Sequence, residues 1–121
     1  MTASPDAVGL QVRDVERAAE FYRRHFGLES DPSAPPGVVL FKTDTIPFLI
    51  REPLPGTDLD AGPPGNGISI SLRVEHAQAL HDRLKAAGVA ILMDPFDTPI
   101  GRTFMFRDPE GYAVAIHGTV G

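Results

Sequence analysis

The sequence contains no cysteine. It can therefore form no disulfide bond, no thiolate metal site and no thiol nucleophile. Basic residues are also few, because 11 Lys and Arg stand against 16 Asp and Glu and give a formal charge of −5. Proteins that bind nucleic acid normally carry a basic patch or stripe, so we expect neither nucleic acid nor an anionic membrane surface as a partner.

Long apolar runs are missing as well. The longest are strand-sized, such as residues 38–41 and 48–50, whereas a membrane-spanning helix needs about 20 apolar residues. Residues 1–6 lack the basic and apolar regions of a secretory signal. We therefore expect a cytoplasmic protein with no membrane segment.

The first half of the chain predicts a strand followed by a helix. Apolar residues alternate with others over residues 8–12, which is typical of a half-buried strand. Asp14 then stands at a helix N-cap position, and apolar residues recur at helical spacing over residues 15–26. Gly27 can end this helix in the left-handed conformation. Three short extended segments follow, at residues 28–31, 38–42 and 46–51.

The same pattern restarts after residues 53–66, which contain four prolines and three glycines and which we interpret as a linker. An alternating strand over residues 68–74 precedes a helix that begins near His76 and ends at Gly88. Three more extended segments close the chain, with a type I turn at residues 108–111 between the last two: residues 89–93, 103–107 and 112–117.

The two halves therefore look like a duplicated unit, since Val12 and Val74, like Gly27 and Gly88, lie about sixty residues apart. We predict an α+β protein made of two βαβββ modules, at about residues 7–52 and 67–118, within one domain spanning residues 1–121. Each module has one apolar sheet face and one apolar helix stripe. Helix and sheet should pack on those surfaces and leave the other sheet face free.

Several motifs in this order resemble the vicinal oxygen chelate superfamily, which includes glyoxalase I, extradiol dioxygenases, fosfomycin-resistance enzymes and bleomycin-resistance proteins. They are residues 12–14, 21–22, 26–28, 101–104 and 106–112. The resemblance implies that the two modules form a cupped mixed sheet with the helices on its convex face. It also implies a ligand on the concave face and a homodimer.

The positions where enzymes of this superfamily hold a metal carry other residues here. They correspond to Ala7, Ser69, Ala115 and one of residues 49–51. Alanine has no donor atom, and a catalytic Zn²⁺, Fe²⁺ or Mn²⁺ site needs about three converging nitrogen or oxygen ligands. Three of the four histidines fall on or beside the predicted helices, away from the cleft: His25, His76 and His81. We expect no metal and no other cofactor.

The predicted cleft is lined by small, polar and aromatic side chains, which suit a flat or hydrophobic molecule. Strand alternation assigns some of them, whereas the assignment of Phe41, Phe48, Phe104 and Met105 depends on hairpin registers that are open by one residue. The predicted ligand-binding residues are Gln11, Phe41, Phe48, Ser69, Ser71, Arg73, Phe104, Met105, Ala115 and His117.

The leading hypothesis is a metal-independent binding protein that sequesters a hydrophobic or aromatic antibiotic or natural product and so confers drug resistance. It assigns no catalytic residue. One alternative is a glyoxalase-like or dioxygenase-like enzyme, such as a lyase or epimerase, with His117 as a general base. Another is a dimeric interaction module with a vestigial cleft. For His117 itself, a solvated position at a strand end is also open.

Overall fold

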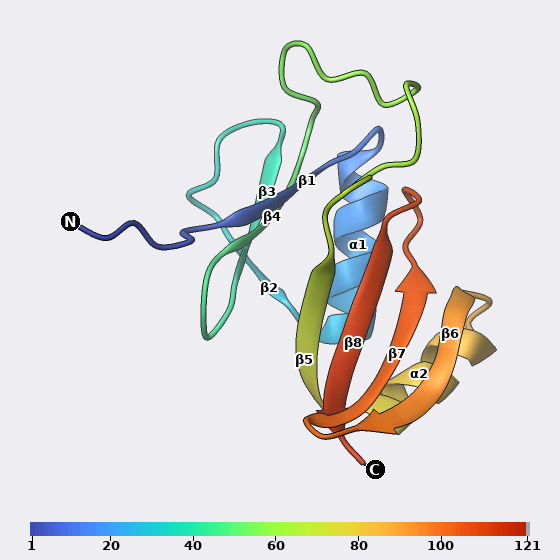
Figure 1. The fold of residues 1–121 in the computed structure, drawn as a ribbon. Coiled ribbons are helices and arrows are strands. Elements are labelled where there is room, and N and C mark those ends of the chain that lie inside the picture. Colours follow the sequence, from blue (N-terminus) through green and yellow to red (C-terminus); the bar gives the residue numbers. More distant parts are fainter. Residues whose placement is uncertain (121) are drawn as a thin grey trace. The chain divides into compact units, whose positions relative to one another are not determined.

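The structure is a computed structural model that describes residues 1–120. The chain divides into two compact units, Met1–Ala61 and Gly62–Gly121. Each unit contains one helix and one four-stranded sheet, with the elements in the order βαβββ (Figure 1). The predicted α+β fold class is confirmed, and the boundary between the units lies inside the Pro- and Gly-rich segment.

The first unit comprises β1 (Val8–Gln11), α1 (Val15–Phe26), β2 (Glu29–Asp31), β3 (Val38–Lys42) and β4 (Phe48–Arg51). Its sheet has the strand order β1-β4-β3-β2. β1 runs parallel to β4, and the other neighbours are antiparallel. The first and last strands of this unit are therefore neighbours in its sheet.

Helix α1 begins and ends where its sequence signals predict. The side chain of Asp14 accepts a hydrogen bond of 3.0 Å from the backbone N–H of Arg17. Gly27 adopts φ 65°, and its N–H donates to the carbonyl oxygen of Arg23. The apolar stripe of the helix packs on β3 and β4, so that its buried residues are Ala18, Ala19 and Tyr22.

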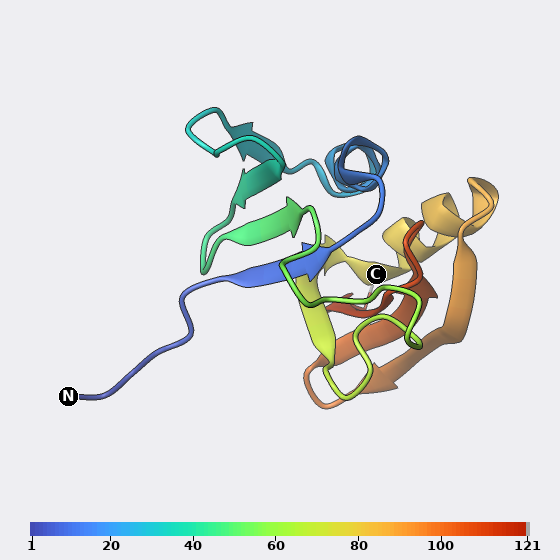
Figure 2. The same cartoon turned by 90° about the horizontal axis from the view of Figure 1, so that it is seen from above.

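The second unit comprises β5 (Ile70–His76), α2 (Ala77–Ala86), β6 (Ala90–Thr98), β7 (Gly101–Arg107) and β8 (Ala113–Thr119). Its sheet has the order β5-β8-β7-β6, with β5 parallel to β8. Figure 2 shows α2, in gold, on one side of the orange and red strands. In the part of the chain described, neither helix is long and apolar enough to cross a membrane.

Two details of the second unit differ from the sequence-based expectation. The sequence predicts that β6 ends at Met93, but the strand continues to Thr98, through Pro95. Pro95 is tolerated because β6 is an edge strand, and its pairing with β7 shifts between Met93 and Phe96. On α2, helical spacing predicts a buried stripe of Ala77, Leu80, Leu84 and Ala87, but the structure buries His81 with the first three and leaves Ala87 exposed.

Candidate functional site

The face of the second sheet that points away from α2 is named the open face. The opposite face packs against the helix, since Phe104 on β7 lies 5.4 Å from the imidazole of His81 on α2, between ring centroids. Alternation along each strand then assigns each remaining side chain to one of the two faces. Residues whose neighbours in sequence are buried against α2 belong to the open face.

Strand register arranges the open face in rows. One row crosses the four strands as Ser71, Ala115, Met105 and Met93, and the next crosses them as Arg73, His117, Thr103 and Phe96. The structure therefore brings together five of the predicted binding residues. They are Ser71, Arg73, Met105, Ala115 and His117.

The β6 side of the open face is apolar and exposed. Met93 is 45% exposed and Phe96 46% exposed, although both are large hydrophobic side chains. Met93 is the register partner of Met105, and the methyl group of Ala115 follows on the next strand. Flexible thioethers and one aromatic ring beside small residues form a surface that suits a flat apolar molecule.

The β5 and β8 side of the open face is polar. The hydroxyl oxygen of Ser71 lies 3.2 Å from Nδ1 of His117, which is half-buried. Thr103, the register partner of His117 on β7, donates a hydrogen bond of 2.6 Å from its hydroxyl to the carbonyl oxygen of Ile116. His117 therefore lies within β8, between the neighbouring strands β5 and β7, and its imidazole is held by a hydrogen bond.

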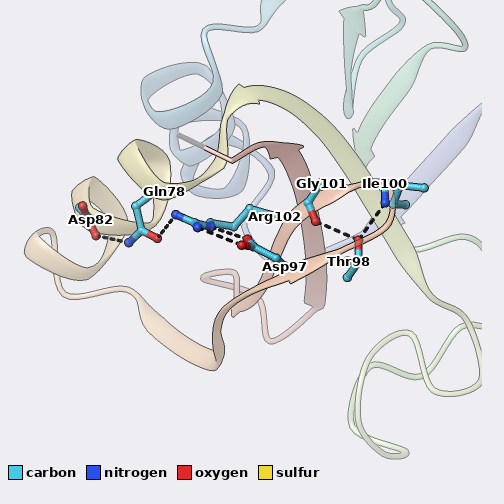
Figure 3. A network of polar contacts seen from close by, with 7 residues as sticks. All are labelled: Gln78, Asp82, Asp97, Thr98, Ile100, Gly101 and Arg102. Carbon is cyan, nitrogen blue, oxygen red and sulfur yellow. Dashed lines mark hydrogen bonds and ion pairs between the residues drawn. The ribbon is translucent and has the colours of Figure 1, made fainter.

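The hairpin that carries Phe96 is tied to α2 by a polar network (Figure 3). Nε and a terminal nitrogen of Arg102 donate to the two carboxylate oxygens of Asp97, at 2.7 Å and 3.2 Å. The other terminal nitrogen of Arg102 donates to the side-chain carbonyl of Gln78 on α2. Asp97 directly follows Phe96, so the network fixes the backbone from which the aromatic ring projects to the opposite face.

We expect Asp97→Asn to weaken the fold in a pH-dependent manner. The hydrogen bonds from Arg102 hold the pKa of Asp97 below its ordinary value of 3.8. Because the folded-state pKa is lowered, the stabilisation is present above the unfolded-state pKa and is lost as pH falls through the folded-state pKa. The denaturation midpoints of wild type and Asp97→Asn should therefore converge as the pH is lowered through the acidic range. Arg102→Gln should reproduce the loss, and a difference that stays constant with pH would contradict this assignment.

Three predicted binding residues lie on helix-facing sides instead. Phe41 and Phe48 are register partners in the first sheet, and the ring of Phe48 lies edge-on to Tyr22 of α1, 5.1 Å between centroids. Phe104 is fully buried under α2. These positions correct the expectation that the three rings border the ligand, because each ring contributes to the core of its own unit.

The two remaining predicted residues lie outside these rows. Gln11 is on the helix-free side of the first sheet, where its side-chain carbonyl accepts a hydrogen bond of 2.7 Å from the N–H of Leu54. It therefore holds the beginning of the linker segment. Ser69 directly precedes β5 and is exposed.

Sequence reasoning missed Met93 as a lining residue and missed Phe96 altogether. Both lie on β6, and the Asp94-Pro95 pair made the strand appear to end before Phe96. The usable signal was the apolar residue after Pro95, since a proline in an otherwise strand-like run also fits an edge strand. The register shifts on both sides of Met93 then turn the two side chains to the open face.

The open face does not fit a divalent cation. Ala115, at the position of a family metal ligand, has no donor atom and lies between Ser71 and Met105 in its row. His117 is the only imidazole in either row, and neither row contains a carboxylate. Across residues 1–120, no three His, Cys, Asp or Glu side chains are grouped so that they could hold a metal. No metal-dependent step is therefore assigned to this face.

Two βαβββ units, each with a helix on one sheet face, define a protein of the vicinal oxygen chelate type. The family model described as the Glyoxalase/Bleomycin resistance protein/Dioxygenase superfamily matches residues 4–116. The chain belongs to this superfamily, as its motifs suggested. No curated protein matches the chain.

Solved structures with the same fold include proteins of different activities. TnmS3, an antibiotic binding protein from Streptomyces sp. CB03234, is 26% identical with a TM-score of 0.75, over 98% of each chain. A glyoxalase/bleomycin resistance protein from the same organism is also 26% identical, with a TM-score of 0.72 over 94% of this chain and 99% of that one. The fosfomycin resistance protein FosX from Listeria monocytogenes is 18% identical with a TM-score of 0.74, over 99% and 96% of the chains, which shows the fold alone.

Proposed function

We propose that this protein binds a hydrophobic or aromatic small molecule on the open face of its second sheet without a metal. Its biological role is to sequester an antibiotic or natural product in the cytoplasm. The observation that carries the proposal is the exposure of Met93 and Phe96, next to Met105, on a sheet face whose remaining members are small or polar. Large apolar side chains that gather on an exposed surface generally mark a binding site.

The chemistry of the face supports binding more than catalysis. His117 is the only side chain of the two rows that can act as a general base, and its Nδ1 is engaged with Ser71. The apolar side of the face, formed by Met93, Phe96 and Met105, offers no acid or base to a molecule that lies over it. The similarity to TnmS3, which is an antibiotic binding protein, points in the same direction.

Calorimetry with a panel of hydrophobic and aromatic antibiotics tests this proposal. We expect at least one compound to bind, and Phe96→Ala to weaken that binding by about 2 kcal/mol, or roughly thirtyfold, because the ligand loses its aromatic contact. Ile100→Ala is the matched control, since Ile100 is 75% exposed but lies in the turn after β6. If nothing in the panel binds more tightly than about 1 mM, the proposal is contradicted.

We also propose that the protein forms a homodimer, as the family resemblance implies. Light scattering in solution should then give about twice the 13.0 kDa mass of one chain.

An enzyme that uses a metal is the competing function. Near-stoichiometric Zn, Fe, Mn or Ni in protein purified without chelator would favour the enzyme over the binding protein.

A further inference from the structure

The open face separates its polar side chains from its apolar ones. The large apolar side chains, Met93, Phe96 and Met105, belong to β6 and β7, whereas Ser71, Arg73 and His117 belong to β5 and β8. Of the other two members, Ala115 on β8 is small, and the hydroxyl of Thr103 on β7 donates to the carbonyl oxygen of Ile116. The outer strands of the sheet, β5 and β6, are three inter-strand spacings apart. Each spacing is about 4.8 Å, so the two sides lie roughly 14 Å apart at the backbone. A ligand that covers both must be polar at one end and apolar at the other.

The polar side carries a positive charge that no neighbouring carboxylate neutralises. Arg73 is exposed, and its guanidinium makes no hydrogen bond or ion pair with any residue in the described part of the chain. Its register partner is His117, and the adjacent row contains Ser71 and Ala115. The nearest carboxylate along β5, Glu75, lies beyond the register shift that follows Arg73. An anionic group on a ligand would therefore meet Arg73 without displacing a protein partner.

His117 can supply a second donor beside Arg73. Its hydrogen bond with Ser71 allows either tautomer. In the tautomer in which the Ser71 hydroxyl donates to Nδ1, the ring proton lies on Nε2, which then donates away from Ser71. Arg73 and His117 are register partners on parallel strands, so both donors can reach one acceptor group.

We infer that the ligand is an amphipathic aromatic anion. Its flat apolar body lies over Met93, Phe96 and Met105, and its carboxylate, sulfonate or phenolate oxygen accepts hydrogen bonds from Arg73 and His117. A body of two to four fused rings spans the separation of the two sides. This inference rests on the proposed function, because it specifies the class of molecule that the open face binds.

Two fluorescent probes test the inference, because anilinonaphthalene sulfonate and phenylnaphthylamine share one ring framework and differ by the sulfonate. We expect wild type to bind the sulfonate about tenfold more tightly than the uncharged amine, since a charge-assisted hydrogen bond contributes about that factor. Arg73→Gln should abolish the preference and change the affinity for the amine by less than about twofold. Lys85→Gln is the matched control, because it removes the same charge from exposed Lys85 on α2, opposite the open face.

The outcomes separate the inference from the proposed function. If the amine binds and the preference for the sulfonate is absent in wild type, or survives in Arg73→Gln, the anion inference is wrong and the proposed function stands. If neither probe binds wild type, both are wrong. An unchanged thermal midpoint in each variant shows that dye binding does not report on loosened structure.

Discussion

Gly101→Ala is expected to destabilise the second unit by about 3–5 kcal/mol. Gly101 begins β7 and adopts φ 128°, a conformation that residues with a side chain rarely take. A Cβ atom there would lie far inside van der Waals contact of the carbonyl oxygen of Gly118 on β8. The backbone at Gly118 is in turn packed closely against β5, since a Cβ on Gly118 would lie 2.5 Å from the carbonyl oxygen of Val74. Urea denaturation gives the free energy of unfolding directly.

Two further glycines separate the contributions of backbone strain and steric overlap. Gly88 has φ 83°, and a methyl group at this position would meet no neighbouring atom within 4 Å. Backbone strain is then the only penalty, so Gly88→Ala should cost about 1–2 kcal/mol. Gly62 has neither feature, and Gly62→Ala should change the unfolding free energy by less than about 0.5 kcal/mol. Equal effects at Gly101 and Gly88 would show that the close approach of β7 and β8 is not what Gly101 provides.

Phe104→Ala is expected to destabilise the second unit by about 3–5 kcal/mol, the usual range for a fully buried phenylalanine. The ring of Phe104 is inaccessible to solvent, packs edge-on to His81 and lies 6.5 Å from the ring of Phe106, between centroids. Its removal leaves a cavity between β7 and α2. Thermal or urea unfolding measures the loss.

Phe96→Ala is the matched control for Phe104→Ala, because both residues are phenylalanines of the β6–β7 pair on opposite faces of one sheet. Phe96 is 46% exposed, so its removal should cost less than about 1 kcal/mol of stability while weakening ligand binding. If Phe96→Ala were the more destabilising of the two, the assignment of the open face would be wrong.

Local signals in the sequence predicted most elements of the fold. Asp14 and Gly27 marked the two ends of the first helix correctly, because helix capping depends only on residues within one turn. The turn at residues 108–111 forms as expected, with the N–H of Gly111 donating to the carbonyl oxygen of Asp108 at 3.0 Å. The prediction ended β6 too early, because propensity alone cannot distinguish a proline that ends a strand from one that is tolerated at a sheet edge.

The lining of the site was less predictable, because it depends on register. For β7, a local argument existed: the turn pairs Arg107 with Ala113, which places Met105 opposite Ala115 and turns Phe104 inward. For Phe48, no local argument of this kind existed. Its orientation follows from the parallel pairing of Val8 with Phe48, which joins segments forty residues apart and is set by the whole unit.

The most direct test of a binding site on the open face uses methyl NMR of the methionines. The sequence has three: Met93 and Met105 are register partners on the open face, and Met1 is fully exposed at the N-terminus. During titration with phenylnaphthylamine, we expect the methyl signals of Met93 and Met105 to shift together, while that of Met1 stays in place. Binding that is detected by calorimetry but leaves both open-face methyl signals unchanged would contradict the account.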